Sequence, residues 1–161
     1  MTTALYPGTF DPITNGHLDI ACRASALFDK VIIGVYDTPA KTLMFNTQER
    51  IELVKKAVEH MPNVEAEPFS ILTIEFAKKI GAQTIVRGLR VLSDFEREFE
   101  LALMNKKLSD EIESVFLMAS LRYQFISSSL LKEVASLGGS IEGLVPDVVA
   151  EALKKKLPMK A

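Results

Sequence analysis

YPGTFDPITNGHL, residues 6–18, joins the first apolar run of the chain to its first helical pattern. The prolines and glycines of this stretch predict a turn after a short strand, and Thr14 is placed to cap a helix that begins at Asn15 or Gly16. A helix start presents unpaired backbone N–H groups and the positive end of the helix dipole, which together favour a bound anion. The stretch therefore predicts a strand, a turn and a helix start that can hold a phosphate.

Two side chains of this stretch, Thr14 and His17, are three residues apart. If the helix begins near Asn15, a hydroxyl and an imidazole can face the same anion. In the alternative interpretation, Thr14 or Asn15 only caps the helix, and His17 is a surface residue of its first turn. The spacing alone leaves both interpretations open.

Apolar runs of strand length alternate with helical patterns along nearly the whole sequence, which is typical of α/β proteins. Several runs are apolar throughout, as expected for a parallel sheet that is covered on both faces. The predicted strands are residues 3–6, 31–36, 64–68, 84–87 and 113–118. The predicted helices are residues 16–28, 47–60, 73–80, 93–109, 129–137 and 146–157. We therefore expect a doubly wound, five-stranded parallel sheet with right-handed crossovers.

The length and composition indicate a single domain, residues 1–161, since a chain of this length buries roughly 70% of the surface that its unfolded form exposes. With 48% hydrophobic residues, 25% charged residues and a net charge of −2, no nucleic-acid partner is expected. The single cysteine cannot form an internal disulfide, and the N-terminus has no basic segment followed by a long apolar run, so we expect a cytoplasmic protein without a membrane partner. Cys22 falls on the apolar stripe of the first helix with Leu18, Ala21 and Phe28, which predicts a packed thiol and not a nucleophile.

The helix predicted at residues 93–109 carries apolar side chains on two sides. One stripe contains Phe95, Phe99, Ala102 and Leu103, and the other contains Leu101, Met104 and Leu108. We expect one stripe to pack on the sheet and the other to meet a ligand, a neighbouring element or another subunit. Core packing beneath a loop is the alternative.

Ligands of an open parallel sheet bind beyond the carboxyl ends of its strands, where the strand order reverses. The predicted loops at this edge carry hydroxyl groups, glycines and cations: residues 8–17 after the first strand, Lys41 after the second, residues 87–90 after the fourth and residues 123–129 after the fifth. Serines 127–129 supply hydroxyl and N–H groups at a predicted helix start, a second place for an anion. The sequence contains no P-loop, G-x-G-x-x-G, G-x-S-x-G, HExxH or Cys/His cluster, and no base-activated nucleophile is evident. The expected chemistry therefore depends on positioning and on charge stabilisation at phosphorus, and no metal-ligating residues are predicted.

The chain resembles the phosphopantetheine adenylyltransferase family of T/HxGH nucleotidyltransferases in a set of motifs that spans almost its whole length: YPGTFDPITNGHLD, the loop around Lys41, RGLR followed by DFExE, ESVFLM and FISSS. Residues 70–73 and Tyr123 depart from the family pattern, in which an acidic or glycine-bearing loop and a tryptophan are common. The resemblance implies a Rossmann-like nucleotidyltransferase fold. It also implies that the 4′-phosphate of phosphopantetheine attacks the α-phosphorus of ATP, giving dephospho-coenzyme A and pyrophosphate with Mg²⁺.

The resemblance also implies the roles of individual residues. His17 corresponds to the stabiliser of the transition state at the ATP phosphates, and Lys41 and Arg87 correspond to the pair that holds the acceptor's phosphate. The implied ATP-binding residues are Thr9, Phe10, His17, Gly88, Leu89, Arg90, Glu98, Tyr123, Gln124, Phe125, Ile126, Ser127, Ser128 and Ser129. The implied phosphopantetheine-binding residues are Thr9, Lys41, Thr73, Arg87, Leu101, Met104 and Asn105. The family further implies a homohexamer, a dimer of trimers, that coenzyme A inhibits.

Two rival functions remain at this point. One is an adenylyl- or cytidylyltransferase that acts on a different acceptor, against which Lys41 and the RGLR motif argue. The other is a nucleotide-binding regulatory module without turnover, because a fold does not decide a function. His17 together with two predicted phosphate sites argues against the second rival.

Overall fold

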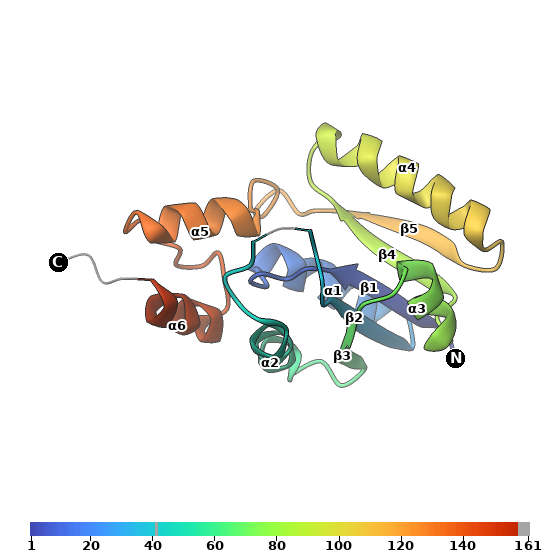
Figure 1. Cartoon of the computed structure of the whole chain (residues 1–161), viewed down its shortest axis with the longest axis horizontal. Coiled ribbons are helices and arrows are strands. Elements are labelled where there is room, and N and C mark those ends of the chain that lie inside the picture. Colours follow the sequence, from blue (N-terminus) through green and yellow to red (C-terminus); the bar gives the residue numbers. More distant parts are fainter. Residues whose placement is uncertain (41, 158–161) are drawn as a thin grey trace.

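Five parallel strands form one sheet in the computed structural model, which describes residues 1–40 and 42–157 without the side chains of residues 92 and 93 (Figure 1). The strands are β1 (Thr3–Gly8), β2 (Lys30–Tyr36), β3 (Val64–Phe69), β4 (Thr84–Leu89) and β5 (Glu113–Met118). Their order in the sheet is β3-β2-β1-β4-β5, and every neighbouring pair is parallel. The prediction of a doubly wound, five-stranded parallel sheet is therefore confirmed.

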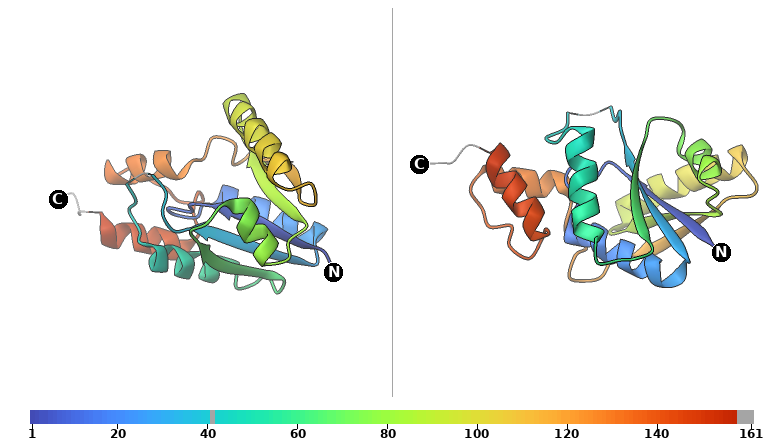
Figure 2. Two further views of the ribbon diagram at one scale, coloured as in Figure 1. Left: turned by 45° about the vertical axis from the view of Figure 1, so that its right-hand side comes forward. Right: turned by 90° about the horizontal axis from the view of Figure 1, so that it is seen from below.

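The helices follow the strands as predicted, with ends that differ by one or two residues. They are α1 (Asn15–Leu27), α2 (Thr47–Val58), α3 (Thr73–Lys79), α4 (Leu92–Leu108), α5 (Ser128–Ser136) and α6 (Asp147–Lys156). The strands run from the N-terminus towards the side on which α5 and α6 lie, and Figure 2 shows the same arrangement from two further sides. In the described part of the chain, no helix combines the length and the apolar character that crossing a membrane requires.

Two apolar clusters cover the two faces of the sheet, because successive side chains of a strand point to opposite sides. Ala4, Ile33 and Val86 belong to the larger cluster, which also contains buried residues of α1, α2 and α6. Leu5 and Ile32 belong to the smaller cluster on the other face, with residues of α3. Both faces of the central strands are thus buried, which explains why their sequences are apolar throughout.

The strand order reverses between β1 and β4, and there the two strands separate early. Their paired residues are only Ala4 with Thr84 and Leu5 with Ile85. In contrast, β1 stays paired with β2 as far as Gly8. The carboxyl ends of β1 and β4 are therefore free of each other, which opens a crevice at the edge where ligands of such sheets bind.

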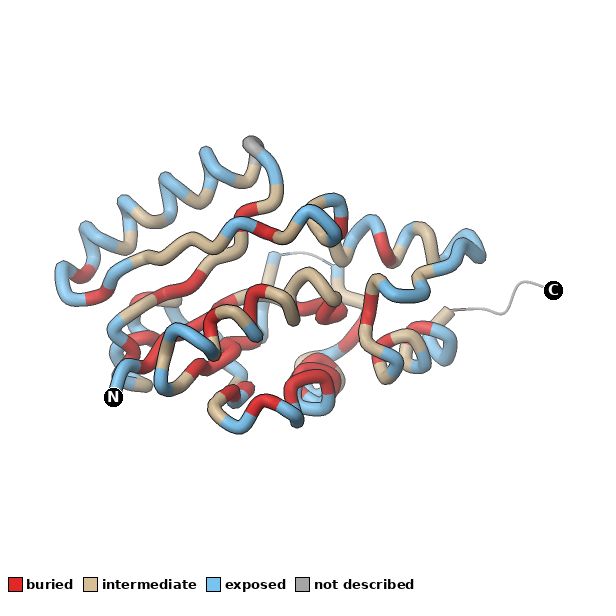
Figure 3. Tube along the Cα trace, turned by 180° about the vertical axis from the view of Figure 1, so that it is seen from behind, coloured by how far each residue is buried: buried red, intermediate tan, exposed pale blue. Residues whose placement is uncertain are grey.

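The prediction for the two stripes of α4 is wrong in part. The first stripe does not pack on the sheet, since Phe95, Phe99 and Leu103 are 50%, 50% and 57% exposed. The less exposed side of α4 carries Asp94, Glu98, Asn105 and only Ala102 of that stripe, and no described side chain of α4 is buried (Figure 3). The helix is oriented by carboxylates that pair with arginines of the β4 end, and periodicity in apolar residues does not report such pairs.

The prediction of a packed Cys22 thiol is also wrong, because Cys22 is exposed. The buried residues of α1 are Ile20, Ala21 and Ala24. Cys22 follows Ala21 by one position, about 100° further round the helix, and this rotation places it outside the buried side.

Candidate active site

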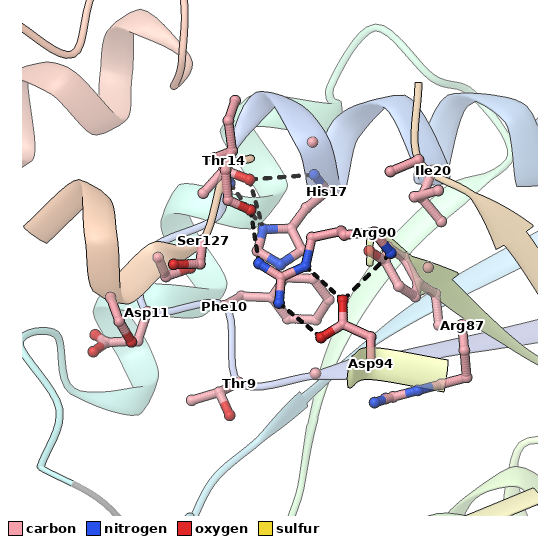
Figure 4. Close-up of a pocket in the computed structure, with 18 of the residues that line it drawn as sticks. Thr9, Phe10, Asp11, Thr14, His17, Ile20, Arg87, Arg90, Asp94 and Ser127 are labelled. Atoms are coloured by element: carbon pink, nitrogen blue, oxygen red, sulfur yellow. Dashed lines mark hydrogen bonds and ion pairs between the residues drawn. The ribbon is translucent and has the colours of Figure 1, made fainter. Parts of the chain in front are cut away.

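A cavity of about 580 Å³ lies beyond the carboxyl ends of β1 and β4. Its walls come from the turn after β1, the first turn of α1, the end of β4, the first turns of α4 and the start of α5 (Figure 4). This is the crevice at the reversal of strand order where the ligand site was predicted. Most of the predicted ATP-binding residues line it, namely Thr9, Phe10, His17, Gly88, Arg90, Glu98, Tyr123, Ile126, Ser127, Ser128 and Ser129.

His17 lies in the first turn of α1, and hydrogen bonds to Thr14 fix its ring. The backbone N–H of Thr14 donates to Nδ1 of His17 over 3.1 Å, and the Thr14 hydroxyl lies 3.0 Å from the same nitrogen. Thr14 Oγ1 in turn accepts the His17 N–H at 3.3 Å, so the two residues form a capping box with histidine at its third position. Because a backbone N–H can only donate, Nδ1 acts as an acceptor, and in the neutral ring the proton resides on Nε2.

Thr14 therefore caps the helix, as predicted, and its side chain is almost wholly buried. His17 is not the plain surface residue of the alternative interpretation, since it lines the cavity. The ring of Phe10 packs against the imidazole ring of His17: the two rings meet edge to face with centroids 5.1 Å apart. Phe10 has a φ of 50°, which bulky residues rarely adopt, and burial of its ring beside Tyr6 and His17 holds this conformation.

Gly88 brings the end of β4 close to α1. A Cβ atom at this position would lie 3.1 Å from Cγ1 of Ile20, so a larger residue would fit only if the Ile20 side chain moved by a few tenths of an ångström. Arg90 follows on the cavity side, and its Nη1 donates to the carbonyl of Ile126 over 2.8 Å. Arg90 also pairs with Asp94, with Nε to Oδ2 at 2.9 Å and Nη2 to Oδ1 at 3.2 Å.

The serines at the start of α5 have separate tasks. Ser127 is the N-cap, and its Oγ accepts the N–H of Leu130 over 3.1 Å. Ser128 Oγ donates to the carbonyl of Pro12 over 2.8 Å, which ties α5 to the turn after β1. The starts of α1 and α5 thus converge on one cavity, and both present the N–H groups that favour an anion.

Asp11 joins three parts of the site. Its carboxylate is 2% exposed and accepts the backbone N–H of Met44 and of Phe45, at 3.0 and 2.9 Å. It also accepts a hydrogen bond from Lys132 of α5 over 2.6 Å. Burial alone would raise the pKa of Asp11, but the Lys132 ammonium and the two N–H groups hold this pKa below its ordinary value.

Arg50 of α2 is fully buried at 0% exposure and donates almost entirely to backbone carbonyls. Nη1 donates to the carbonyls of Thr9 and Tyr36, each at 2.8 Å, and Nε donates to that of Phe45 at 3.2 Å. Nη2 donates to the Asp37 carbonyl at 3.3 Å. The guanidinium therefore holds together the turn after β1 and both ends of the segment that joins β2 to α2.

The predicted phosphopantetheine-binding residues are divided between two places. Thr73 and Asn105 line a second cavity of about 60 Å³ on the face of the sheet that α3 and α4 cover, while Thr9 lines only the large one. Arg87 and Leu101 line both cavities. Arg87 is bound to Glu98 through two hydrogen bonds and to the carbonyl of Pro7 through a third.

Lys41 lies outside the described residues. The other predicted site residues, Leu89, Met104, Gln124 and Phe125, line neither cavity. Leu89 is buried, and its carbonyl accepts the N–H of Ala119. Met104 and Phe125 are exposed, and Gln124 donates to the Ala119 carbonyl over 3.4 Å.

The described residues do not fit a magnesium site built by protein groups alone. Mg²⁺ takes oxygen ligands, with carboxylates foremost. The carboxylates that line the large cavity are those of Asp11, Asp94 and Glu98, and each is held in an ion pair with a lysine or an arginine. In the described part of the chain, no three His, Cys, Asp or Glu side chains gather in a group that could hold a metal ion.

The sequence analysis assigned no role to Asp11, Arg50 or Lys132. For Arg50 a signal was present: it precedes Val54 by four residues and Val58 by eight, so it lies on the inward side of α2 although it is charged. Lys132 and Asp11 are 121 residues apart, and no local pattern indicates that they meet.

Comparison with known proteins gives a consistent set of matches. Residues 5–134 match the family model described as cytidylyltransferase-like. A phosphopantetheine adenylyltransferase of Roseiflexus sp. (strain RS-1) is 52% identical over 155 residues, which cover 96% of this chain and 97% of that protein. Proteins with the same name from Caldanaerobacter subterraneus subsp. tengcongensis and Dictyoglomus turgidum are 52% and 49% identical, over 97% and 99% of this chain and 98% and 100% of theirs.

Proposed function

Because the chain belongs to the phosphopantetheine adenylyltransferase family of the cytidylyltransferase-like proteins, we infer that it transfers AMP from ATP to 4′-phosphopantetheine, which gives 3′-dephospho-coenzyme A and pyrophosphate. The structural observation that best supports this function is the convergence of His17, Arg90 and the starts of α1 and α5 on one cavity at the reversal of strand order. The N–H groups of two helix starts and the guanidinium of Arg90 can together bind the negatively charged phosphates of a nucleotide. Arg87, which lines both the large and the small cavity, supplies a cation for the phosphate that the acceptor brings.

His17 acts at the ATP phosphates in the mechanism that we propose. Its Nδ1 accepts the Thr14 N–H, so Nε2 is the nitrogen that donates a proton to a hydrogen bond. A donor held in place before the reaction stabilises negative charge that develops on the phosphoryl oxygens as the bond to pyrophosphate breaks. His17 therefore stabilises the transition state and forms no bond to phosphorus.

The transfer is direct in this proposal. An oxygen of the acceptor phosphate attacks the α-phosphorus of ATP, and the bond to the bridging oxygen of pyrophosphate breaks on the opposite side. Among the described residues that line the large cavity, none is a cysteine, and serines 127 and 128 are engaged in a cap and in a tether to Pro12. ATP that carries a chiral α-phosphorothioate should therefore give a product of inverted configuration. Retention would show a covalent intermediate.

Magnesium enters this proposal with ATP. Mg²⁺ is often bound through substrate phosphates with few protein ligands, and the ion pairs of the cavity carboxylates agree with that mode. The family resemblance further supports a hexamer and inhibition by coenzyme A. A cytoplasmic location stays a prediction.

One experiment tests the function directly. The protein is incubated with Mg²⁺, either ATP or CTP, and a panel of phosphorylated acceptors that includes 4′-phosphopantetheine and pantetheine without the phosphate. We expect pyrophosphate release with ATP and 4′-phosphopantetheine only. Turnover with another acceptor or with CTP would favour the rival transferase, and the absence of any turnover would favour the binding module.

A further inference from the structure

Three of the five N–H donors of the Arg87 guanidinium bond to neighbouring groups. Its Nε donates to Oε2 of Glu98 over 2.7 Å, and its Nη2 donates to Oε1 of the same carboxylate over 2.5 Å. Its Nη1 donates to the carbonyl of Pro7 over 2.8 Å. The side chains of Arg87 and Glu98 are 29% and 12% exposed, so the pair is well shielded from water. Parallel hydrogen bonds of this kind are among the stronger polar contacts of a protein.

The pair lies where the two cavities meet. Pro7, Arg87, Glu98 and Leu101 are the residues that line both cavities. Nucleotide-side residues such as His17 line only the large cavity, and Thr73 lines only the small one. A ligand in either cavity thus contacts the same ion pair from its own side.

The predicted roles of the two residues conflict with their pairing. Arg87 is assigned to the acceptor's phosphate and Glu98 to the nucleotide, yet each holds the other. A phosphate and a carboxylate compete for the same guanidinium fork, because both accept the same pair of N–H groups. An acceptor phosphate that binds Arg87 through Nε and Nη2 therefore displaces Glu98 from this fork.

The element that carries Glu98 is suited to a small displacement. No described side chain of α4 is buried. Asp94, one turn before Glu98, holds Arg90 in the same two-bonded manner. The contacts of α4 with the β4 end thus include two ion pairs, which can exchange partners without opening an apolar core.

We propose that Glu98 is a positioning residue that couples the two substrates: a nucleotide that engages the Glu98 carboxylate from the large cavity releases the Arg87 fork for the phosphate of the acceptor. The ribose of a nucleotide has hydroxyl groups that can donate to such a carboxylate. ATP and phosphopantetheine then bind with positive coupling, and each strengthens the other by the same factor. This inference rests on the proposed function, since it assigns the two cavities to these substrates.

Calorimetric titration tests the coupling without turnover. 4′-Phosphopantetheine is titrated into the protein alone and into the protein saturated with α,β-methylene-ATP, whose α–β linkage cannot be cleaved. For the wild type we expect the nucleotide analogue to lower the Kd of phosphopantetheine by at least about fivefold. In Glu98→Gln, which keeps the size but removes the charge, we expect tighter binding of phosphopantetheine without nucleotide and a coupling ratio within about twofold of one.

Glu100→Gln is the matched control, because it removes the same charge from an exposed position of α4. It should keep the coupling ratio of the wild type. A wild-type ratio near one, or an unchanged ratio in Glu98→Gln, would overturn the inference while leaving the proposed function intact. Failure of the wild type to bind phosphopantetheine under either condition would overturn the proposed function, and the inference with it.

A measurement on the wild type avoids reliance on a variant. In protein labelled with ¹⁵N-arginine, the Nε–H resonance of Arg87 is assigned by its loss in Arg87→Lys. We expect α,β-methylene-ATP alone to shift this resonance, because Glu98 leaves Nε. An unshifted Arg87 resonance at saturating nucleotide would overturn the proposed release.

Discussion

Nδ1 of His17 accepts a hydrogen bond from the backbone of Thr14, so part of what fixes the ring is a group that side-chain substitution cannot remove. Phe10 supports the other side of the ring through an edge-to-face contact. A donor held by such groups loses little freedom when charge develops beside it, which is the condition for strong stabilisation of a transition state. At the scale of single residues, the site is thus prepared by backbone hydrogen bonds and ring packing.

His17→Ala should lower kcat by on the order of 10²–10³, with a smaller change in ATP affinity, because the lost hydrogen bond is strongest in the transition state. Steady-state kinetics and calorimetric titration of the α,β-methylene analogue measure the two effects separately. Cys22→Ala, on the same helix but exposed, should keep the wild-type rate. A His17→Ala variant with a near-normal kcat would leave His17 as a capping residue only.

Arg90→Ala should weaken the nucleotide analogue about 10- to 100-fold and change phosphopantetheine binding by only a few fold when each ligand is titrated alone. Lys41→Ala should do the reverse. The reason is that a ligand phosphate that loses one charge-assisted hydrogen bond loses roughly 1.5–3 kcal/mol of binding free energy. Equal weakening of both ligands by Lys41→Ala would contradict this division and indicate that the loop acts as a general cover.

Elements of the site are held together by two buried charged side chains. Arg50 connects α2 to the turn after β1 and to the segment between β2 and α2. Asp11 connects the same turn to the residues before α2 and to Lys132 of α5. Loops at the carboxyl edge of the sheet lack the regular backbone hydrogen bonds of strands and helices. Their carbonyl and N–H groups therefore need partners such as these two side chains.

Arg50→Met should destabilise the fold by about 3 kcal/mol or more, because several buried carbonyls lose their donors while the volume stays similar. Urea unfolding followed by circular dichroism measures this loss. Lys55→Met, an exposed position of the same helix, is the control and should change stability by less than about 0.5 kcal/mol. A loss of stability for Arg50→Met as small as that of the control would show that water replaces the guanidinium.

Asp11 should contribute to the pH dependence of stability. Its pKa in the folded protein is lower than its ordinary value of 3.8, so the folded state favours the carboxylate. The resulting stabilisation is fully present above about pH 4 and is lost as the pH falls through the lower, folded-state pKa.

The corresponding measurement compares wild type and Asp11→Asn in urea unfolding between pH 2.5 and 7. Asp11→Asn should be less stable than wild type at pH 7, and the difference should shrink as the pH falls below 4. Asp110→Asn is the control, because Asp110 is exposed in the turn between α4 and β5. A stability difference for Asp11→Asn that did not change with pH would show that Asp11 acts through its shape and not its charge.

The whole molecule presents a large apolar surface on the outer side of α4. Phe95, Phe99 and Leu103 follow one another at intervals of four residues, and the rings of Phe95 and Phe99 stack at 5.9 Å. A row at this spacing lies along one side of a helix, and monomeric proteins rarely expose so many apolar groups together. This row suits contact with a further copy of the chain, in line with the proposed hexamer.

Phe99→Glu should therefore reduce the assembly to smaller species in sedimentation velocity experiments, because a carboxylate in an apolar interface loses its water without gaining a partner. Leu27→Glu is the matched control: Leu27 is 61% exposed on α1, away from this row, and its substitution should leave the sedimentation coefficient unchanged. A Phe99→Glu variant that sedimented like the wild type would exclude the outer side of α4 from the interface.

The sequence by itself determined the fold class, the five strands, the helices to within one or two residues and the capping function of Thr14. These features depend on local propensity and on apolar periodicity, both of which are written along the chain. The family motifs further predicted the catalytic role of His17 and the substrate residues, and the structure gathers most of these around two neighbouring cavities.

Only the tertiary structure decided which polar groups meet. The ion pairs of Asp11 with Lys132 and of Arg87 with Glu98 join residues 121 and 11 positions apart, and the buried position of Arg50 depends on carbonyls from the turn after β1 and from both ends of the connection between β2 and α2. The orientation of α4 was mispredicted for the same reason, since its less exposed side carries Asp94 and Glu98, which pair with Arg90 and Arg87. Pairings of this kind depend on distances across the folded chain, and local sequence patterns contain no information about them.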